Sequence, residues 1–332
     1  ESGDGAHRFN LMQTFVLRDS GLRQSVDDDP MLSRDAYSSG ADFEMNFMER
    51  TYGISGSVVT TMIQNAPIAG DPSTQEDLNV GTGGSLRMGK YGGNWRGQLR
   101  GRWESDQLDP NDIGLLFAAD EYSTGMWVQR RMNPEEGSYL TNGNVNFNYW
   151  QSWLFAGRDF EDPANPGTTL WSYDPWNPQS SGMNVNGWLQ NRSRWSAFGG
   201  IWTDFPGTSK YATRTFEGVR GPLMRTGQTQ GFWLGLSTDW RKSLVGELEF
   251  DGAFDEFGSW NWSVDFDVNW VQSARMNHSV SIGYRDRFSD AQWINNYADV
   301  GGVPAIGGVS YVFGELDNQT VDLTLRSNLL FT

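Results

Sequence analysis

The stretch Trp260-Asn-Trp-Ser-Val-Asp-Phe-Asp-Val-Asn-Trp270 alternates between two kinds of side chain without a break. Its even positions are large and apolar, and its odd positions are Asn, Ser or Asp. Successive side chains of a β-strand point to opposite faces, so this alternation predicts a strand with one apolar and one polar face. Eleven residues are about what a tilted strand needs to cross a bilayer. The stretch therefore favours a membrane β-barrel over a soluble enzyme.

The same alternation recurs along the chain. Residues 244–254 place Leu and Phe on one face and Glu247, Glu249 and Asp251 on the other. Weaker copies stand at 95–103, 139–149, 232–240 and 320–331. Amphipathic segments of roughly ten residues, separated by turn residues, are typical of transmembrane β-barrels. We count about 16 of them, which predicts an all-β fold: an antiparallel transmembrane β-barrel of about 16 or more strands, with a polar lumen and aromatic girdles.

The composition agrees with one β-rich unit. The 332 residues include 40 Gly, 16 Trp, 11 Tyr and 19 Phe, yet only 37% are hydrophobic and the mean hydropathy is −0.56. No run approaches the roughly 18 apolar residues of a membrane helix. We expect a single barrel domain over 1–332, in which 1–40 is a poorly patterned lead-in with one or two strands. Long loops are expected at 161–182 and 205–226.

Charge and cysteine content exclude several classes of site and partner. The net charge of −16 disfavours nucleic acid as a partner, because a phosphate backbone selects basic surfaces. The chain has no cysteine, which excludes disulfides, thiolate metal sites and cysteine nucleophiles. The start, Glu1-Ser-Gly-Asp-Gly, lacks the basic and apolar regions of a signal peptide. Since a barrel must be exported, we expect a mature product or a fragment.

Four ordered motifs carry a resemblance to a known family. They are Gly93-Asn-Trp-Arg-Gly-Gln-Leu-Arg100, Asn111-Asp-Ile-Gly-Leu115, Gly221-Pro222 before a Trp-rich segment, and the C-terminal stretch 313–332. Together they resemble the barrel of an uncharacterised bacterial outer-membrane family. Its members usually carry an N-terminal carbohydrate-binding-like domain of the family-nine type. The resemblance implies a location and an architecture but no reaction, and it implies that this chain is truncated at both ends.

The alternation also assigns side chains to faces. Arg96, Arg100 and Arg102 share one face of a predicted strand and are expected to point into the lumen. The acidic residues expected to face the lumen are Glu247, Glu249, Asp251, Asp265 and Asp267. Such charges either fix the interior by pairing or bias a pore, and both readings stay open. The residues expected to face lipid are Trp260, Trp262, Phe266, Trp270 and Phe250.

Candidates for catalysis or metal binding are few. His7 and His278 are the two histidines, and neither stands in a motif that would make it a base. Asp27, Asp28 and Asp29 are weak metal-ligand candidates, because carboxylates bind hard cations but an acidic run is usually solvated. We therefore expect no catalytic residue, no enzymatic activity and no cofactor.

The leading hypothesis is an outer-membrane β-barrel that serves as a pore, transporter or envelope-passage component in a Gram-negative-type bacterium. Its expected partners are outer-membrane lipid, other envelope proteins, and a carbohydrate or other small cargo. Two alternatives remain. One is a secreted carbohydrate-binding or carbohydrate-active β-sandwich, and the other is a surface scaffold barrel held by partner proteins.

Overall fold

The computed structural model describes residues 7–17, 35–68, 71–109, 119–162, 165–216, 219–298, 301 and 305–331. Every helix or strand element in these ranges is a β-strand. No helix that could span a membrane is found in them. Fourteen strands form one large antiparallel sheet, and six short strands form three two-stranded sheets. The predicted all-β, antiparallel fold is confirmed.

The large sheet is a meander, because its strands follow one another in chain order. Its strands are β1 (His7–Leu17), β2 (Asp35–Phe47), β3 (Tyr52–Ile68), β4 (Asp71–Lys90), β5 (Trp95–Glu104), β6 (Glu121–Met132), β7 (Leu140–Trp153), β10 (Pro178–Asn191), β11 (Ser196–Phe205), β16 (Thr229–Ser237), β17 (Leu244–Asp255), β18 (Trp260–Ser273), β19 (Met276–Ala298) and β20 (Val309–Leu329). The short pairs are β8 (Arg158–Asp162) with β9 (Asn165–Tyr173), β12 (Gly207–Ser209) with β15 (Met224–Thr226), and β13 (Thr215–Phe216) with β14 (Val219–Arg220).

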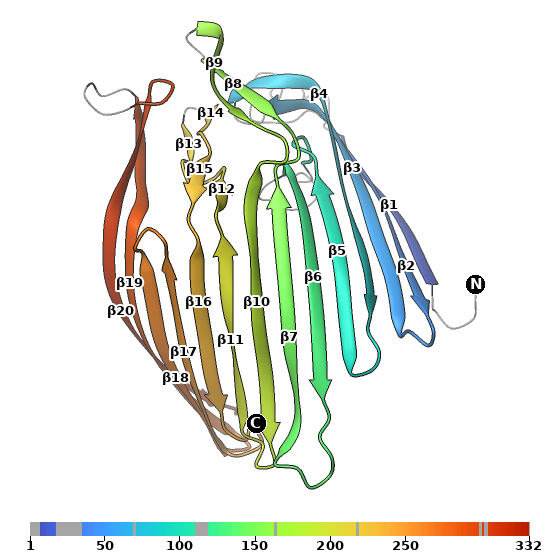
Figure 1. Cartoon of the computed structure of the whole chain (residues 1–332), viewed down its shortest axis with the longest axis vertical. Helices are drawn as coiled ribbons and strands as arrows, with labels where there is room; N and C mark the ends of the chain where they lie inside the picture. Colours follow the sequence, from blue (N-terminus) through green and yellow to red (C-terminus); the bar gives the residue numbers. More distant parts are fainter. Residues whose placement is uncertain are drawn as a thin grey trace.

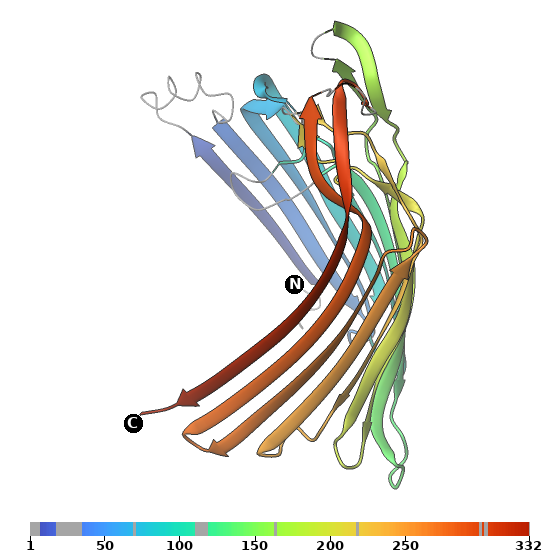
Figure 2. The same ribbon diagram turned by 90° about the vertical axis from the view of Figure 1, so that its left-hand side faces the viewer.

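The large sheet curves into a deep trough that is open along one side (Figures 1 and 2). The strands β7, β10 and β11 form its back, and β1 and β20 are its two edges. In the part of the chain that the structure describes, these two edges are not paired with each other. The trough is a single layer of strands, so a concave and a convex face remain.

The strand number differs from the predicted sixteen or so, chiefly because two pairs of predicted strands each form one long strand. The alternation predicts separate strands at 278–287 and 291–298, but both lie in β19, whose pairing shifts between Ser289 and Gln292. A β-bulge of this kind bends a strand without ending it. The predicted strands at 307–314 and 318–331 likewise form the single strand β20. Another predicted strand, 113–120, lies almost wholly outside the described residues.

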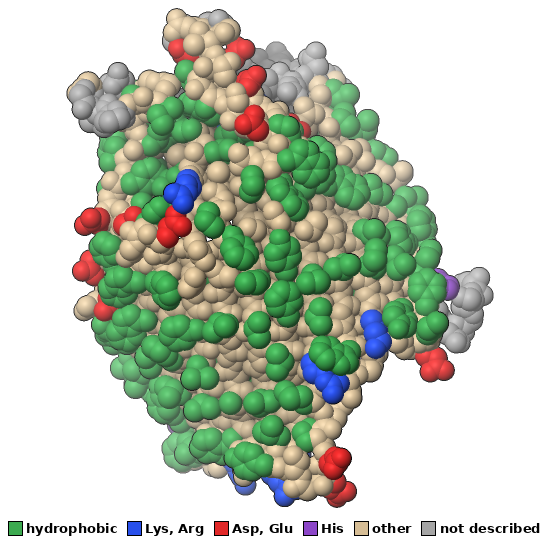
Figure 3. Space-filling view, in the orientation of Figure 1, with side chains coloured by type: hydrophobic (Ala, Val, Ile, Leu, Met, Phe, Trp, Pro, Cys, Tyr) green, Lys and Arg blue, Asp and Glu red, His purple; other side chains and the backbone are tan. Residues whose placement is uncertain are grey.

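The convex face carries most of the exposed apolar side chains of the sheet strands (Figure 3). Directly opposite residues of an antiparallel pair share a face, so the register extends the apolar set of β18 across the sheet. Phe266 stands opposite Leu248 of β17, and Leu248 stands opposite Leu236 of β16. On the other side, Phe266 stands opposite Ile282 of β19. These side chains are exposed, Phe266 at 43% and Ile282 at 47%. The sheet thus presents a continuous apolar surface outward.

The two ends of the trough differ. At the lower end in Figure 1 the strands are joined by short turns, such as 48–51, 91–94 and 192–195. At the upper end longer connections carry the short strands β8, β9 and β12 to β15. The largest buried apolar cluster lies there and consists of Leu154, Phe160 and Tyr173. The fold therefore has a small core under its long connections and no central one among the described residues.

Candidate functional site

The concave face is the candidate site, because it gathers most of the polar side chains of the sheet strands. Its residues alternate with the apolar set, so each row can be followed through the strand register. One row runs Gln129, Asn146, Asn186 and Gly200, from β6 to β11. It continues through Trp233 of β16 and Asp251 of β17. Three strips of this face differ in charge.

The basic strip lies on β4 and β5 and consists of Arg87, Arg96, Arg100 and Arg102. Arg87 stands directly opposite Arg100 in the register. Arg100 lies across Gly125 of β6, since a Cβ added to that glycine would meet the Arg100 Nε at 2.6 Å. Arg102 forms an ion pair with Glu104 of its own strand. Like charges placed directly opposite destabilise a sheet unless water screens them.

The acidic strip lies on β17 and β18 and consists of Glu247, Glu249, Asp251, Asp265 and Asp267. Glu247 stands opposite Asp267, and Glu249 stands opposite Asp265. Neighbouring serines bind part of the strip: Ser263 donates to Asp251 and, at 3.2 Å, to Asp265. The repeated pairing of like charges indicates a surface that water reaches.

The basic and acidic strips lie on opposite walls of the trough (Figure 2). Five strands, β6, β7, β10, β11 and β16, separate β5 from β17 in the sheet. No ion pair between the two strips is found among the described residues. In this structure the two sets of charges therefore do not fix the interior by pairing.

The residues expected to face lipid all lie on the convex, apolar face. Trp260, Phe266, Trp270 and Phe250 are exposed. Trp262 is half-buried because its ring packs between Phe250 and Tyr284, with centroids at 6.5 and 5.0 Å.

Residues between the charged strips were not singled out by the sequence. The concave positions of β7, β10, β11 and β16 are almost all Asn, Gln, Ser, Gly, Trp or Phe. The amides form a chain: Asn146 donates to Asn186 at 2.8 Å and Asn148 donates to Asn184 at 2.8 Å. Trp127 Nε1 donates to Asn146 Oδ1 at 3.1 Å. The four alternate asparagines at 142–148 are the one sign of this polar row in the sequence. The sequence does not show which residues of β6 and β10 lie beside them, because that depends on the strand register.

The connection between β11 and β16 crosses the upper mouth of the trough. The buried Lys210 donates from Nζ to the carbonyl oxygens of Ala119 and Asp120, at 2.6 and 3.0 Å. Three residues further on, the Thr213 carbonyl accepts a 2.9 Å bond from Asn296 of β19. Because β6 begins just after Asp120, this connection joins two distant parts of the sheet. Burial lowers the pKa of Lys210 and raises the pKa of Asp120.

The long connection that carries β8 and β9 is tied to the same segment. Tyr173 donates from its hydroxyl to the Gly221 carbonyl at 2.6 Å. Burial raises the pKa of Tyr173 to about 12, so the hydroxyl stays protonated as a donor. Residues 207–226, which we name the mouth loop, therefore contact the connections before β6, before β10 and the upper part of β19.

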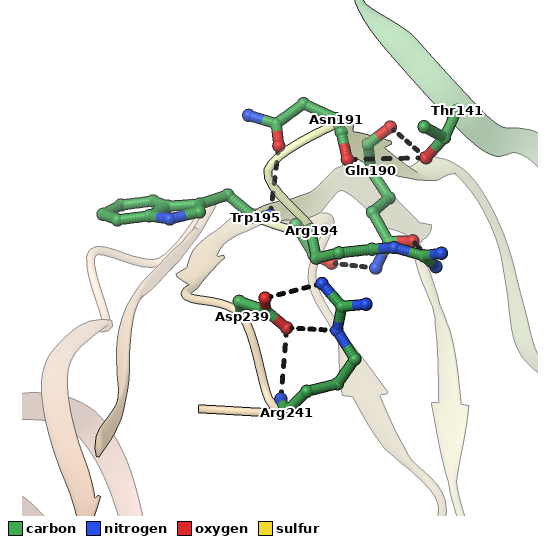
Figure 4. Close-up of polar contacts among 8 residues, drawn as sticks. Thr141, Gln190, Asn191, Arg194, Trp195, Asp239 and Arg241 are labelled. Carbon is green, nitrogen blue, oxygen red and sulfur yellow. Dashed lines mark hydrogen bonds and ion pairs between the residues drawn. The ribbon is translucent and has the colours of Figure 1, made fainter. Parts of the chain in front are cut away.

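The short-turn end has its own polar contacts (Figure 4). Arg241 binds the Asp239 carboxylate through Nε at 2.9 Å and Nη2 at 2.8 Å. This bidentate bond lowers the pKa of Asp239 to about 2. The ring of Trp195 points away from these groups and is 52% exposed. Exposed tryptophans at this end, Trp95, Trp195, Trp240 and Trp270, follow the edge of the apolar surface.

Neither histidine has the surroundings of a catalytic base. His278 bonds Ser327 and Gln272 and packs against Trp270 on the convex face. His7 packs against Phe47. Asp27, Asp28 and Asp29 lie outside the described residues. Among the residues that the structure does describe, no group of three or more acidic, His or Cys side chains could hold a metal.

Comparisons with known proteins give one family and several distant folds. A family model described as a domain of unknown function, DUF5916, matches residues 31–332. No curated protein matches the sequence. Among solved structures, an anion-selective porin from Comamonas acidovorans is similar at 7% identity and a TM-score of 0.41, covering 98% of this chain and 100% of that one. The in-vitro folded outer membrane protein OmpT of Vibrio cholerae is similar at 10% identity and a TM-score of 0.37, covering 97% and 95%.

Proposed function

The chain belongs to the DUF5916 family, and we propose that it forms a closed β-barrel in the outer membrane of a Gram-negative-type bacterium and lets small polar solutes pass. The observation that carries the proposal is the apolar surface of the convex face, where the strand register aligns exposed apolar side chains from strand to strand. Exposed apolar patches on soluble monomers rarely exceed a few hundred Å². A surface of this extent needs lipid to cover it.

The dimensions support the same placement. Trp260 and Trp270 are ten residues apart on β18 and both are exposed on the convex face. Ten steps of a strand rise about 33 Å, and a tilt of about 45° reduces this to roughly the 25 Å of an apolar barrel band. Short turns at one end and long connections at the other are typical of outer-membrane barrels, whose short turns face the periplasm. We therefore place the mouth loop on the outer side.

Closure of the trough follows from the environment. A strand edge in a bilayer would leave backbone N–H and C=O groups unsatisfied, at several kcal/mol each. β1 and β20 run in opposite directions along the trough, so the two edges are compatible with antiparallel closure, directly or through further strands. The closed form would enclose the basic and acidic strips around a water-filled lumen. That lumen makes passage of polar solutes the best-supported function.

The alternative of a carbohydrate-active β-sandwich has less support. A sandwich packs two sheets face to face around an apolar core. The described residues form one large sheet with a polar concave face, and the three small sheets have two strands each. The scaffold alternative is favoured by one feature, the mouth loop, because its contacts with the segment before β6 and with β19 hold it between distant strands at the upper end.

A planar-bilayer measurement tests the proposal. The purified, detergent-solubilised protein is expected to give discrete conductance steps after insertion, and the heat-unfolded protein is the control. Membrane-inserted protein without conductance would favour the scaffold role. Recovery of a monodisperse protein in detergent-free buffer would contradict the membrane placement itself.

A further inference from the structure

An uncharged strip separates the basic and acidic strips on the concave face. It consists of the concave positions of β7, β10, β11 and β16, from Asn142 to Trp150 along β7 and the rows opposite them. Only Asp204, at its upper end, is charged. The eight steps from Asn142 to Trp150 rise about 27 Å. A strip of this length with a single charge at its upper end, between two charged strips, is complementary to an extended neutral molecule.

Three aromatic rings follow one another down this strip on β11 and β16. Trp202 stands opposite Gly231, Trp233 opposite Gly200, and Phe198 opposite Gly235. The rings therefore alternate between the two strands, and each faces a glycine. Successive ring–glycine pairs are two residues apart, which is about 7 Å along the strands.

Each of these rings lies over its glycine. A Cβ added to Gly231 would meet three atoms of the Trp202 indole at 2.5 to 2.6 Å. A Cβ on Gly200 would meet two atoms of the Trp233 ring at 2.6 and 2.7 Å. The underside of each indole is thus covered by backbone, and the rings are only half-buried. Because these residues occupy concave positions and are half-buried, part of each ring is exposed on the concave face.

The amides beside the rings supply both kinds of hydrogen-bonding group. An asparagine side chain has two N–H donors and an oxygen with two lone pairs. Asn146 uses its full set, since it donates to Asn144 and Asn186 and accepts from Trp127 and Gln129. Asn186 uses one donor, at 2.7 Å to Asn184, and accepts one bond, at 2.8 Å from Asn146. Donors and acceptors remain for a ligand along the same rows.

We propose that the uncharged strip binds a linear neutral oligosaccharide, with sugar rings stacked on Trp202, Trp233 and Phe198 and hydroxyls bonded to the asparagine amides. The proposal rests on the proposed function, because it needs the concave face to line a water-filled lumen. A sugar ring has an apolar C–H face for an indole and hydroxyls that both donate and accept. It has no charge, which agrees with a strip whose single charged side chain lies at its upper end.

The simpler role of the rings is to shield glycine backbone in a strand, as aromatic residues do beside edge glycines. That role stabilises the sheet but gives no affinity for a sugar. The two roles are separated by a binding measurement on folded variants, because shielding alone would leave sugar affinity at zero.

The test is isothermal titration calorimetry of maltohexaose and cellohexaose against the full chain in a detergent without a sugar head group. We expect at least one of the two to bind. The double variant Trp202→Ala/Trp233→Ala is expected to weaken that binding at least tenfold, and Trp233→Phe to retain most of it. The matched control is Trp260→Ala, on the convex face, with unchanged affinity. Heat-modifiable gel mobility and circular dichroism check that each variant folds.

Three results would overturn the proposal. They are binding of neither oligosaccharide by the folded protein, equal affinity of the folded double variant and the parent, and binding of tetraethylammonium in place of both sugars. Conductance without sugar binding would contradict this inference while leaving the pore intact. Sugar binding without conductance would contradict the pore and keep the binding strip.

Discussion

Phe266 and Asp265 are sequence neighbours that the strand places on opposite faces of β18. Phe266 lies among Leu248 and Ile282 on the convex face, whereas Asp265 stands opposite Glu249 on the concave face. The two positions therefore offer the same backbone with two different surroundings. They allow the membrane placement to be tested one side chain at a time.

We predict that Phe266→Arg lowers the free energy of unfolding in lipid vesicles by about 2–4 kcal/mol, as a charged residue does near the bilayer midplane. Asp265→Arg is the matched control. It places the same side chain among carboxylates on a wet face and is expected to be neutral or stabilising. Urea unfolding followed by tryptophan fluorescence measures both. Equal losses in the two variants would contradict the assignment of faces.

A second residue-scale prediction concerns the turn that contains Asp239 and Arg241. The bidentate bond to Arg241 lowers the pKa of the Asp239 carboxyl from 3.8 to about 2. A depressed carboxyl pKa stabilises the folded state above the unfolded pKa, and the contribution is lost as the pH falls toward 2. The parent should thus exceed Asp239→Asn in melting temperature at neutral pH, and the difference should shrink between about pH 4 and pH 2. A difference independent of pH would refute this reading.

At the scale of elements, the mouth loop depends on Lys210. Its Nζ satisfies two carbonyl oxygens, and the side chain is 4% exposed. Removal of a donor leaves buried acceptors unsatisfied, which costs about 1–3 kcal/mol. The loss is local, because the strands below the loop are held by their own backbone bonds.

We predict that Lys210→Met loosens the mouth loop without unfolding the sheet. A protease added on the outer side of the membrane should cleave within 207–226 several-fold faster than in the parent. The conductance should rise, because a loosened mouth loop obstructs the upper opening less. Lys242→Met, in a short turn at the other end, is the control and should change neither. An unchanged cleavage rate in Lys210→Met would show that the loop is held by other contacts.

Strands were predictable from sequence where their environment is simple. The alternation over 260–270 predicts a strand there, and β18 spans Trp260–Ser273. The alternation predicts two strands in place of β19, because the bulge after Ser289 interrupts the alternation there. It also missed the pairs β8–β9 and β12–β15, since short strands in connections are fixed by contacts such as Tyr173 to Gly221 rather than by alternation.

The concave face was less predictable, and the reason lies in the register. The sequence cannot tell that Trp202 and Gly231 stand opposite each other. That pairing is set by the long connection after β11, which determines the register between β11 and β16. The uncharged strip is built from residues of four strands, so it exists only once the strands are aligned.

At the scale of the whole molecule, closure of the trough is the decisive feature. Some backbone N–H groups of β20 over 321–329 point away from β19, toward the open edge of the sheet. We predict that these amides exchange with deuterium in lipid nanodiscs as slowly as those of the central strand β10. The physical reason is that a bilayer does not tolerate an unpaired strand edge. Hydrogen-exchange mass spectrometry makes the comparison. Exchange of 321–329 within seconds, beside a protected β10, would mean that the sheet stays open.

The most direct test of the central claim is a cysteine scan over 260–270 in native membranes. The chain has no cysteine, so each single variant gives a signal without background. Labelling with a membrane-impermeant maleimide should follow the alternation. Cysteines at odd positions such as Asp265 should react, and cysteines at even positions such as Phe266 should be protected. The cysteines at even positions should instead be labelled by a lipid-soluble maleimide that carries a nitroxide. Equal labelling of odd and even positions would contradict a sheet with lipid on its convex face and water on its concave face.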